Sequence, residues 1–283
     1  MENTTEAAGR VWLITGASSG FGRAIARAAL AAGDTVVATA RRPEALDDLV
    51  AAHPGRVSAV RLDVTDQGGI ADVVADALLW HGRIDVLVNN AGRSQIGAVE
   101  ETTDRELRDL MDLHLFGPAA LTRAVLPHMR KRGTGAIVQM SSMGGQLSFA
   151  GFGAYSASKA ALEGMSEALA QEVAPYGIKV LIVEPGAFRT SLFGGALYKS
   201  AALDAYAGTV GPTRTMAETS DGRQPGDPEK AAAAILAALE AEETPLRLPL
   251  GDDAVDALVA HADALRKELL EWEPVARATA FDE

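Results

Sequence analysis

Short runs of consecutive apolar residues alternate along the chain with longer segments in which apolar residues recur every three or four positions. The first pattern is typical of strands buried on both faces, and the second of amphipathic helices. Strands are predicted at residues 11–15, 35–40, 57–62, 84–88, 136–140 and 179–184, with a final edge strand at 246–250. Helices are predicted at residues 23–32, 69–80, 103–131, 154–176, 228–242 and 252–271. This alternation favours an α/β fold in which helices cover both faces of a parallel sheet.

One domain is expected, because no internal repeat, linker or second core interrupts the alternation. We expect residues 1–9 to form a flexible tail and residues 10–283 to form the domain. The pattern weakens after Thr190, where Gly, Pro, Ser and Thr are frequent. Long irregular segments inside compact domains are typical of active-site lids. Residues 190–227 are therefore predicted to be a mobile lid.

Composition narrows the function. The 283 residues include 26 Lys and Arg against 38 Asp and Glu, which gives a formal net charge of −12 and disfavours a nucleic-acid surface. With 0 Cys, thiol catalysis and cysteine-ligated zinc are excluded, and no metal site is expected. The N-terminus lacks the pattern of a signal peptide, and the longest apolar run, Ala231–Leu239, is too short to span a membrane. We expect a cytoplasmic protein without a membrane partner.

A glycine-rich turn at residues 16–22, with the spacing G-x-x-x-G-x-G, separates the first predicted strand from the first helix. Glycines let backbone N–H groups approach a phosphate, and the helix N-terminus adds positive potential. As the first turn of a βαβ series, it favours nucleotide binding over an ordinary turn. The same turn also reads G-x-S-x-G around Ser18, as in serine hydrolases. That interpretation is disfavoured because only fifteen residues precede Gly16, and no earlier loop can supply an oxyanion site.

A tyrosine, a lysine and a serine form a candidate catalytic group. Tyr155 and Lys159 are four residues apart in a predicted helix and therefore share one face. A phenol with a pKa of about 10 is a poor base near neutral pH, and a nearby ammonium favours its phenolate. Ser142 follows the strand at 136–140, where open α/β sheets place their ligands. The alternatives are an incidental helix pair and a loop serine that satisfies backbone groups.

Together these motifs resemble the classical short-chain dehydrogenase/reductase family over residues 10 to about 190. The matching motifs are T-G-x-x-x-G-x-G at 15–22, Asp63-Val64 after the third strand, N-N-A-G at 89–92, Ser142, Y-x-x-x-K at 155–159 and P-G-x-x-x-T at 185–190. The resemblance implies a Rossmann-type, doubly wound parallel sheet with strand order 3-2-1-4-5-6-7. It also implies homodimers or homotetramers formed through the helices at 103–131 and 154–176.

The resemblance also implies roles for single residues. Tyr155 would be the general acid/base, Ser142 would bind the substrate oxygen, and Lys159 would hold the nicotinamide ribose and lower the pKa of Tyr155. The predicted cofactor-binding residues are Thr15, Gly16, Ser18, Ser19, Gly20, Phe21, Gly22, Arg41, Arg42, Asp63, Val64, Asn90, Ala91, Gly92, Tyr155, Lys159, Pro185, Gly186, Phe188 and Thr190. The implied activity is hydride transfer between a nicotinamide cofactor and a ketone or secondary alcohol. A non-catalytic, cofactor-binding sensor with the same fold is the alternative.

The end of the second predicted strand indicates which cofactor binds. An enzyme that prefers NAD(H) places Asp or Glu there to bind the ribose 2′-hydroxyl. This chain has Ala40 there, followed by Arg41 and Arg42. A guanidinium suits a 2′-phosphate, so NADP(H) is predicted. Two solvated loop arginines are the alternative.

One position departs from the family pattern, because His114 stands where a catalytic Asn is usual. His114 would either take part in the proton relay or be a core or interface residue that packs against a neighbouring helix or subunit. Because histidine has a reference pKa of about 6.5, a relay role predicts an extra ionisation in the pH profile of activity. The candidate substrate-pocket residues, mostly apolar, are Arg93, Gln146, Phe149, Phe152, Phe193 and Leu197. They favour a hydrophobic carbonyl compound or alcohol as the small-molecule substrate.

Overall fold

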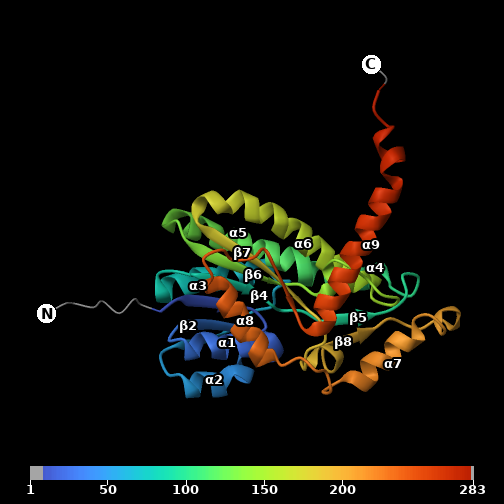
Figure 1. The fold of residues 1–283 in the computed structure, drawn as a ribbon. Helices are drawn as coiled ribbons and strands as arrows, with labels where there is room; N and C mark the ends of the chain where they lie inside the picture. Colours follow the sequence, from blue (N-terminus) through green and yellow to red (C-terminus); the bar gives the residue numbers. More distant parts are fainter. Residues whose placement is uncertain (1–8, 282–283) are drawn as a thin grey trace.

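A seven-stranded parallel sheet forms the centre of the molecule, with helices on both of its faces (Figure 1). The computed structural model describes residues 9–281, so the predicted tail lies outside the described residues except for Gly9. The strands are β1 (Val11–Ile14), β2 (Thr35–Ala40), β3 (Val57–Arg61), β4 (Val86–Asn89), β6 (Gly135–Met140), β7 (Ile178–Pro185) and β9 (Arg247–Leu250). Their spatial order, β3-β2-β1-β4-β6-β7-β9, confirms the predicted order 3-2-1-4-5-6-7 when only these strands are counted.

Alternation along the central strands divides the core into two layers. In β1, Trp12 and Ile14 face one layer of buried residues, and Val11 and Leu13 face the other. The first layer is completed by α1 (Gly20–Ala31) and α8 (Pro228–Glu240), which pack against each other. The second layer is completed by α3 (Gln67–His81), α5 (Gly117–Arg132) and α6 (Gly153–Val173). Burial on both faces explains why these strands read as unbroken apolar runs.

The helix predicted at 103–131 is interrupted. It consists of α4 (Asp104–Met111), a π-helical turn at Asp112–Phe116 and α5. π-turns inside helices are frequent at functional sites. This one carries His114, which is 1% exposed and whose ring is held by hydrogen bonds to two other segments. Hydrophobic spacing cannot reveal such a turn, because one extra residue barely changes the apolar pattern.

The segment 190–227 is not irregular, contrary to the sequence prediction. It contains a 3₁₀ turn (Ser191–Phe193), strand β8 (Leu197–Lys199), a second 3₁₀ turn (Asp204–Tyr206) and α7 (Gly211–Ser220). Strand β8 pairs in parallel with β5 (Ser94–Ile96), a strand that the sequence analysis missed. Val210 and Ala217 are buried with Ile96 in a small third core. Frequent Gly and Pro obscured these contacts. The predicted mobility of the segment stays a prediction.

The remaining elements lie at the periphery of the sheet. They are 3₁₀ turns at Pro43–Leu46, Met143–Gly145 and Ala174–Tyr176, and helices α2 (Asp47–Ala52) and α9 (Asp252–Arg277). Figure 1 shows α9 extending away from the body of the molecule, and it runs beyond the predicted end at residue 271. None of the helices within residues 9–281 is long and apolar enough to cross a membrane. The homodimer or homotetramer expected from the sequence stays a prediction.

Candidate active site

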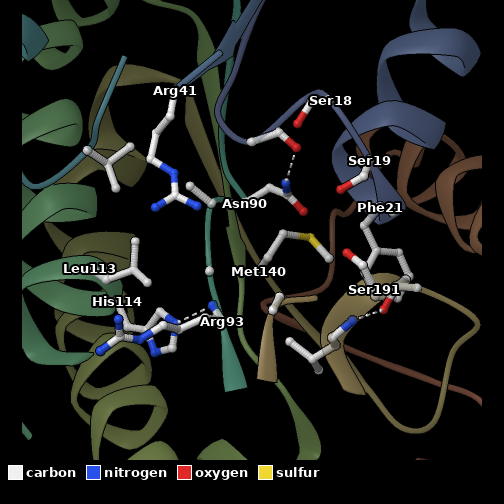
Figure 2. A pocket seen from close by; sticks show the side chains of 18 of the residues that line it. Ser18, Ser19, Phe21, Arg41, Asn90, Arg93, Leu113, His114, Met140 and Ser191 are labelled. Carbon is white, nitrogen blue, oxygen red and sulfur yellow. Dashed lines mark hydrogen bonds between the residues drawn. The ribbon is translucent and has the colours of Figure 1, made fainter. Parts of the chain in front are cut away.

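A cavity of about 600 Å³ opens at the carboxyl ends of β1, β2, β4, β6 and β7 (Figure 2). It gathers most of the residues singled out from the sequence. Those that line it are Gly16, Ser18, Ser19, Gly20, Phe21, Arg41, Arg42, Asp63, Val64, Asn90, Ala91, Gly92, Arg93, His114, Ser142, Tyr155, Lys159, Pro185, Gly186 and Thr190. Strand ends meet at one edge of a parallel sheet, so motifs far apart in sequence converge there.

Hydrogen bonds from the loop after β4 hold the glycine-rich turn in place. The Thr15 Oγ1 accepts hydrogen bonds from the backbone N–H groups of Asn90 (2.9 Å) and Ala91 (3.0 Å), and the Asn90 side-chain amide donates to the Thr15 carbonyl (2.8 Å). Thr15 is 1% exposed and does not line the cavity. A Cβ at Gly22 would lie 2.5 Å from the Gly16 carbonyl oxygen, so only glycine fits there. Thr15 and Gly22 therefore fix the shape of the turn without lining the cavity.

Two glycines of the turn adopt backbone angles that other residues rarely take. Gly16 has φ +66° and Gly20 has φ +53°, in the left-handed region. Phe21 lines the cavity, and its ring packs on that of Phe188, with centroids 5.1 Å apart. Phe188 itself does not line the cavity, so its predicted cofactor contact is replaced by support of Phe21.

An acidic and a basic side chain lie together where β2 and β3 end. Figure 2 shows the Arg41 side chain extending into the cavity from the end of β2. Asp63 Oδ1 accepts hydrogen bonds from the Thr65 N–H (3.0 Å) and hydroxyl (2.8 Å). Burial raises the pKa of Asp63, but these hydrogen bonds and the charges of Arg41 and Arg61 outweigh burial and keep that pKa below its ordinary value. Asp63 therefore stays ionised while Arg41 faces the cavity.

The phenol of Tyr155 is enclosed by two rings. Tyr155 is 7% exposed, with the Phe152 ring 6.2 Å away and the His114 imidazole 5.7 Å away, both edge-on. Burial raises the pKa of Tyr155 to about 12, against a hydrogen bond with Ser142 that lowers it. The Ser142 Oγ also accepts from the Gly144 N–H at 3.1 Å. The phenol is therefore protonated at neutral pH, and Ser142 lies beside it.

Burial outweighs the effect expected of Lys159 on the pKa of Tyr155 in this arrangement. The Lys159 Nζ lies 5.8 Å from the Tyr155 ring centroid and donates to the Met140 carbonyl oxygen at 2.8 Å. Burial lowers the pKa of Lys159 to about 8, and the charge of Glu163 opposes that effect. Desolvation thus dominates both groups, and the ammonium is itself less stable than in water.

The imidazole of His114 has a defined tautomer. Its Nε2 accepts from the Arg93 backbone N–H at 3.2 Å, so Nδ1 carries the proton and donates to Ser158 Oγ at 2.8 Å. The Ser158 hydroxyl in turn donates to the Tyr155 carbonyl oxygen at 2.7 Å. Burial, then the charges of Lys159 and Arg93, hold the pKa of His114 well below its usual range. These surroundings disfavour the ionisation expected for a relay histidine, and the ring of His114 packs edge-on against that of Tyr155.

This assignment makes a stability prediction for His114→Asn. Between pH 7.5 and 5 the unfolded wild-type chain gains a proton at residue 114 that the folded chain does not, so stability falls as pH falls through 6.5. At pH 5 this difference costs the wild type at most about 2 kcal/mol, and the variant lacks it. Denaturant unfolding of both proteins at the two pH values measures it. Equal losses in the two proteins would contradict a neutral, buried His114.

The geometry also argues against the interpretation of Ser18 as the nucleophile of a hydrolase. A serine nucleophile needs a histidine within hydrogen-bond reach as its base. Both ring nitrogens of His114, the cavity's histidine, are occupied by Arg93 and Ser158. Ser18 instead lies in the turn beside Asn90 at the opposite end of the view from His114 (Figure 2). The arrangement therefore offers Ser18 no histidine as a general base.

Most of the candidate substrate-pocket residues lie elsewhere. Arg93 lines the cavity, and its guanidinium stacks 4.2 Å from the centroid of the Tyr198 ring. Gln146 donates to Glu184 at 2.6 Å, and Phe149 is 49% exposed. The other three candidates, Phe152, Phe193 and Leu197, pack in the third core and do not line the cavity.

Other residues line the cavity although no sequence motif identifies them. They are Ala40, Leu62, Thr65, Asp109, Asp112, Leu113, Met140, Ser141, Ser191, Leu192, Gly195, Ala196 and Tyr198. The last five come from the segment before and within β8, which the pairing of β8 with β5 brings over the cavity. These five residues lie within the predicted lid at residues 190–227, which is the sequence signal for this group.

Comparisons with known proteins agree with this arrangement. The family model for short chain dehydrogenases matches residues 10–198. A curated relative, the oxidoreductase BOA17 of Botryotinia fuckeliana, is 39% identical over 272 residues, which cover 96% of this chain and 99% of the relative. A crystal structure of a short-chain dehydrogenase from Streptomyces avermitilis has 68% identity and a TM-score of 0.91, covering 96% of this chain and all of its own.

Two further solved relatives carry a nucleotide. A metagenomic short-chain oxidoreductase in complex with NADP is 29% identical, with a TM-score of 0.68 over 86% of this chain and 97% of its own. A Burkholderia phymatum enzyme in complex with NAD is 23% identical and shares the fold, with a TM-score of 0.80 over 94% of this chain and 95% of its own. The matched family model, the long curated alignment and the shared fold lead to one conclusion: the chain is an oxidoreductase of the short-chain dehydrogenase/reductase family.

Proposed function

We propose that this protein is an NADP(H)-dependent oxidoreductase that interconverts a ketone and a secondary alcohol carrying apolar substituents. The observation that carries the proposal is that the candidate catalytic residues and the candidate cofactor-binding residues converge in one cavity. The side chains of Tyr155, Ser142 and Lys159 line the same cavity as the glycine-rich turn and Arg41. A hydroxyl pair beside a nucleotide cradle is the arrangement that carbonyl reduction requires.

The residues present fit a dinucleotide. The positive φ angles of Gly16 and Gly20 turn the backbone at the N-terminus of α1, where N–H groups and the helix dipole favour a pyrophosphate. Ala40 leaves room at the end of β2, and Arg41 beside it supplies a cation suited to a 2′-phosphate. Lys159 and Thr190 line the cavity and would hold the nicotinamide half, whose ring donates or accepts the hydride when bound.

The protein's own part in the reaction is to donate or accept the proton at the substrate oxygen. Because the pKa of Tyr155 is raised to about 12, the phenol holds its proton at neutral pH and can donate it to a carbonyl oxygen during reduction. Ser142 would hold that oxygen, since its hydroxyl is already hydrogen-bonded with Tyr155. Donation leaves a phenolate, which the Lys159 ammonium, 5.8 Å from the ring centroid, would stabilise.

The segment before β8 supports an apolar substrate more directly than the phenylalanines chosen from the sequence. Leu192 and the ring of Tyr198 line the cavity. Tyr198 is also covered by the Arg93 guanidinium, which fixes the ring at 4.2 Å. Apolar substituents of a ketone would pack against these two side chains.

The experiment that tests the proposal is turnover of NADPH with a panel of aliphatic and aryl ketones, and of NADP with the matching alcohols. The proposal expects cofactor consumption with at least one ketone, and higher turnover with NADPH than with NADH. The rival sensor would bind the cofactor without consuming it with any member of the panel. That outcome, in protein shown to bind NADPH, would overturn the proposed activity.

A further inference from the structure

Two carboxylates that catalysis does not use are buried beside the loop that carries Ser142. Glu163 on α6 is 3% exposed, and Glu184 on β7 is 0% exposed. Glu163 lies one helical turn after Lys159 on the same face of α6. Buried carboxylates need partners, because an isolated charge in the interior is costly.

The loop at residues 141–146 is tied to this pair at both ends. The Ser141 hydroxyl donates to Glu163 Oε1 at 2.5 Å, and the Gln146 side-chain amide donates to Glu184 Oε1 at 2.6 Å. A Cβ added at Gly145 would lie 1.9 Å from Glu163 Oε1, so the loop backbone runs directly against that carboxylate. Ser142 lies between the two ties. Its position therefore depends on both glutamates.

One arginine bridges the pair. An Nη of Arg247, on β9, lies 3.2 Å from Glu163 Oε2 and 2.8 Å from the half-exposed Glu167, and its Nε lies 2.9 Å from Glu184 Oε1. The other ionisable group whose charge couples to this pair, among the described residues, is Lys159 on α6, which interacts with Glu163.

The carboxylates around Arg247 outnumber its single positive charge, so one of them can retain a proton. Two buried carboxylates and the half-exposed Glu167 share this single guanidinium. The Glu184 Oε2 is buried and receives no donor from the described part of the chain. Glu163 and Glu184 meet at the same guanidinium, and the negative charge of Glu163 disfavours ionisation of Glu184. A proton on Glu184 would turn that repulsive contact into a hydrogen bond.

We propose that Glu163 and Glu184 share one proton and, in that state, act as positioning residues that hold the 141–146 loop and place Ser142 against the substrate oxygen. The chemistry is the proton sharing of adjacent carboxyl groups. The catalytic part of this inference rests on the proposed function, whereas the ordering of the loop does not. Loss of the shared proton leaves two negative charges in contact and loosens the loop that both of them bind.

The direction of the pH effect follows from the burial of Glu184. Burial raises the pKa of Glu184 to about 7; the Gln146 hydrogen bond opposes the increase, and the charge of Glu163 adds to it. The stabilising, protonated state is complete below the ordinary carboxyl pKa of about 4.5 and is lost as pH rises through about 7. Turnover and loop order should both decline over that upper range.

Glu184→Gln tests this, because the amide copies the protonated acid and cannot ionise. Wild-type kcat is expected to fall at least threefold more than that of the variant between pH 6 and 8.5, with the Kd for NADPH unchanged in both. Lys159, whose pKa is lowered to about 8, titrates in both proteins and cancels from the comparison. Glu172→Gln is the matched control, since it makes the same chemical change at an exposed glutamate of α6 and should keep the wild-type profile.

Hydrogen exchange of the peptide containing residues 141–146 gives a readout that needs no turnover. We expect exchange at pH 8.5 to be faster in the wild type than in Glu184→Gln, and equal at pH 6. If the wild type turns over no carbonyl compound, the proposed function fails, but this exchange result still decides the inference. Identical profiles and identical exchange in the two proteins would overturn it. Should Glu184→Gln not fold, Glu163→Gln removes the other charge and is expected to give the same result in hydrogen exchange.

Discussion

Replacing Tyr155 with Phe is expected to lower kcat for carbonyl reduction by a factor of about 10² to 10⁴, the range assigned to general acid catalysis. The change removes one oxygen and keeps the ring that packs between Phe152 and His114. The buried site should therefore retain its shape. Because the phenol donates a proton only during the reaction, the Kd for NADPH should change by less than twofold.

The measurement is steady-state turnover with a ketone accepted by the wild type, together with fluorescence titration of NADPH. Tyr176→Phe is the matched control, because it makes the same chemical change at a tyrosine that is 46% exposed and stacks with Arg130. It should leave kcat unchanged. Retention of more than a tenth of wild-type turnover by Tyr155→Phe would show that another group supplies the proton.

Arg41→Ala is expected to weaken NADPH binding by about 1.5–3 kcal/mol, the typical value of a hydrogen bond to a charged group. That corresponds to a Kd roughly 10 to 150 times higher. NADH lacks the 2′-phosphate, so its Kd should barely change, and the preference for NADPH should shrink by the same factor. The physical reason is the position of Arg41 at the cavity, beside the ionised Asp63.

Calorimetric titration of both cofactors into both proteins measures this effect. Arg27→Ala is the control, because it removes an exposed arginine that pairs with Glu229 away from the cavity. It should leave both Kd values unchanged. Equal affinity of the wild type for NADPH and NADH would contradict the assignment of the 2′-phosphate to Arg41.

The strands and the edge that carries the site could be predicted because both depend on long, regular features, whereas the strand order was implied by the family resemblance. Unbroken apolar runs marked the strands of the main sheet, and the motifs at their ends met at one edge. Strands β5 and β8 escaped prediction because each has three residues and pairs across a separation of about a hundred positions. Local patterns carry no information about such contacts.

The chemical details of the site depended on burial, which the sequence does not show. The spacing of Tyr155 and Lys159 suggested a lowered phenol pKa, yet enclosure by rings raises it to about 12. His114 was expected to pack or to titrate, and its hydrogen bonds to Arg93 and Ser158 select packing. Glu163 and Glu184 belong to no sequence motif, although in the structure they hold the loop that carries Ser142.

The central claim is that this chain moves a hydride between the nicotinamide and a carbonyl carbon, and deuterium transfer tests it most directly. Purified protein would be incubated with a ketone and NADPH carrying deuterium at nicotinamide C4, prepared separately as each of its two stereoisomers. The account predicts that one stereoisomer delivers the label to the carbinol carbon, that the other does not, and that Tyr155→Phe delivers almost none. Protein that binds NADPH yet yields no labelled alcohol from either stereoisomer, with every ketone of the panel, would contradict the account.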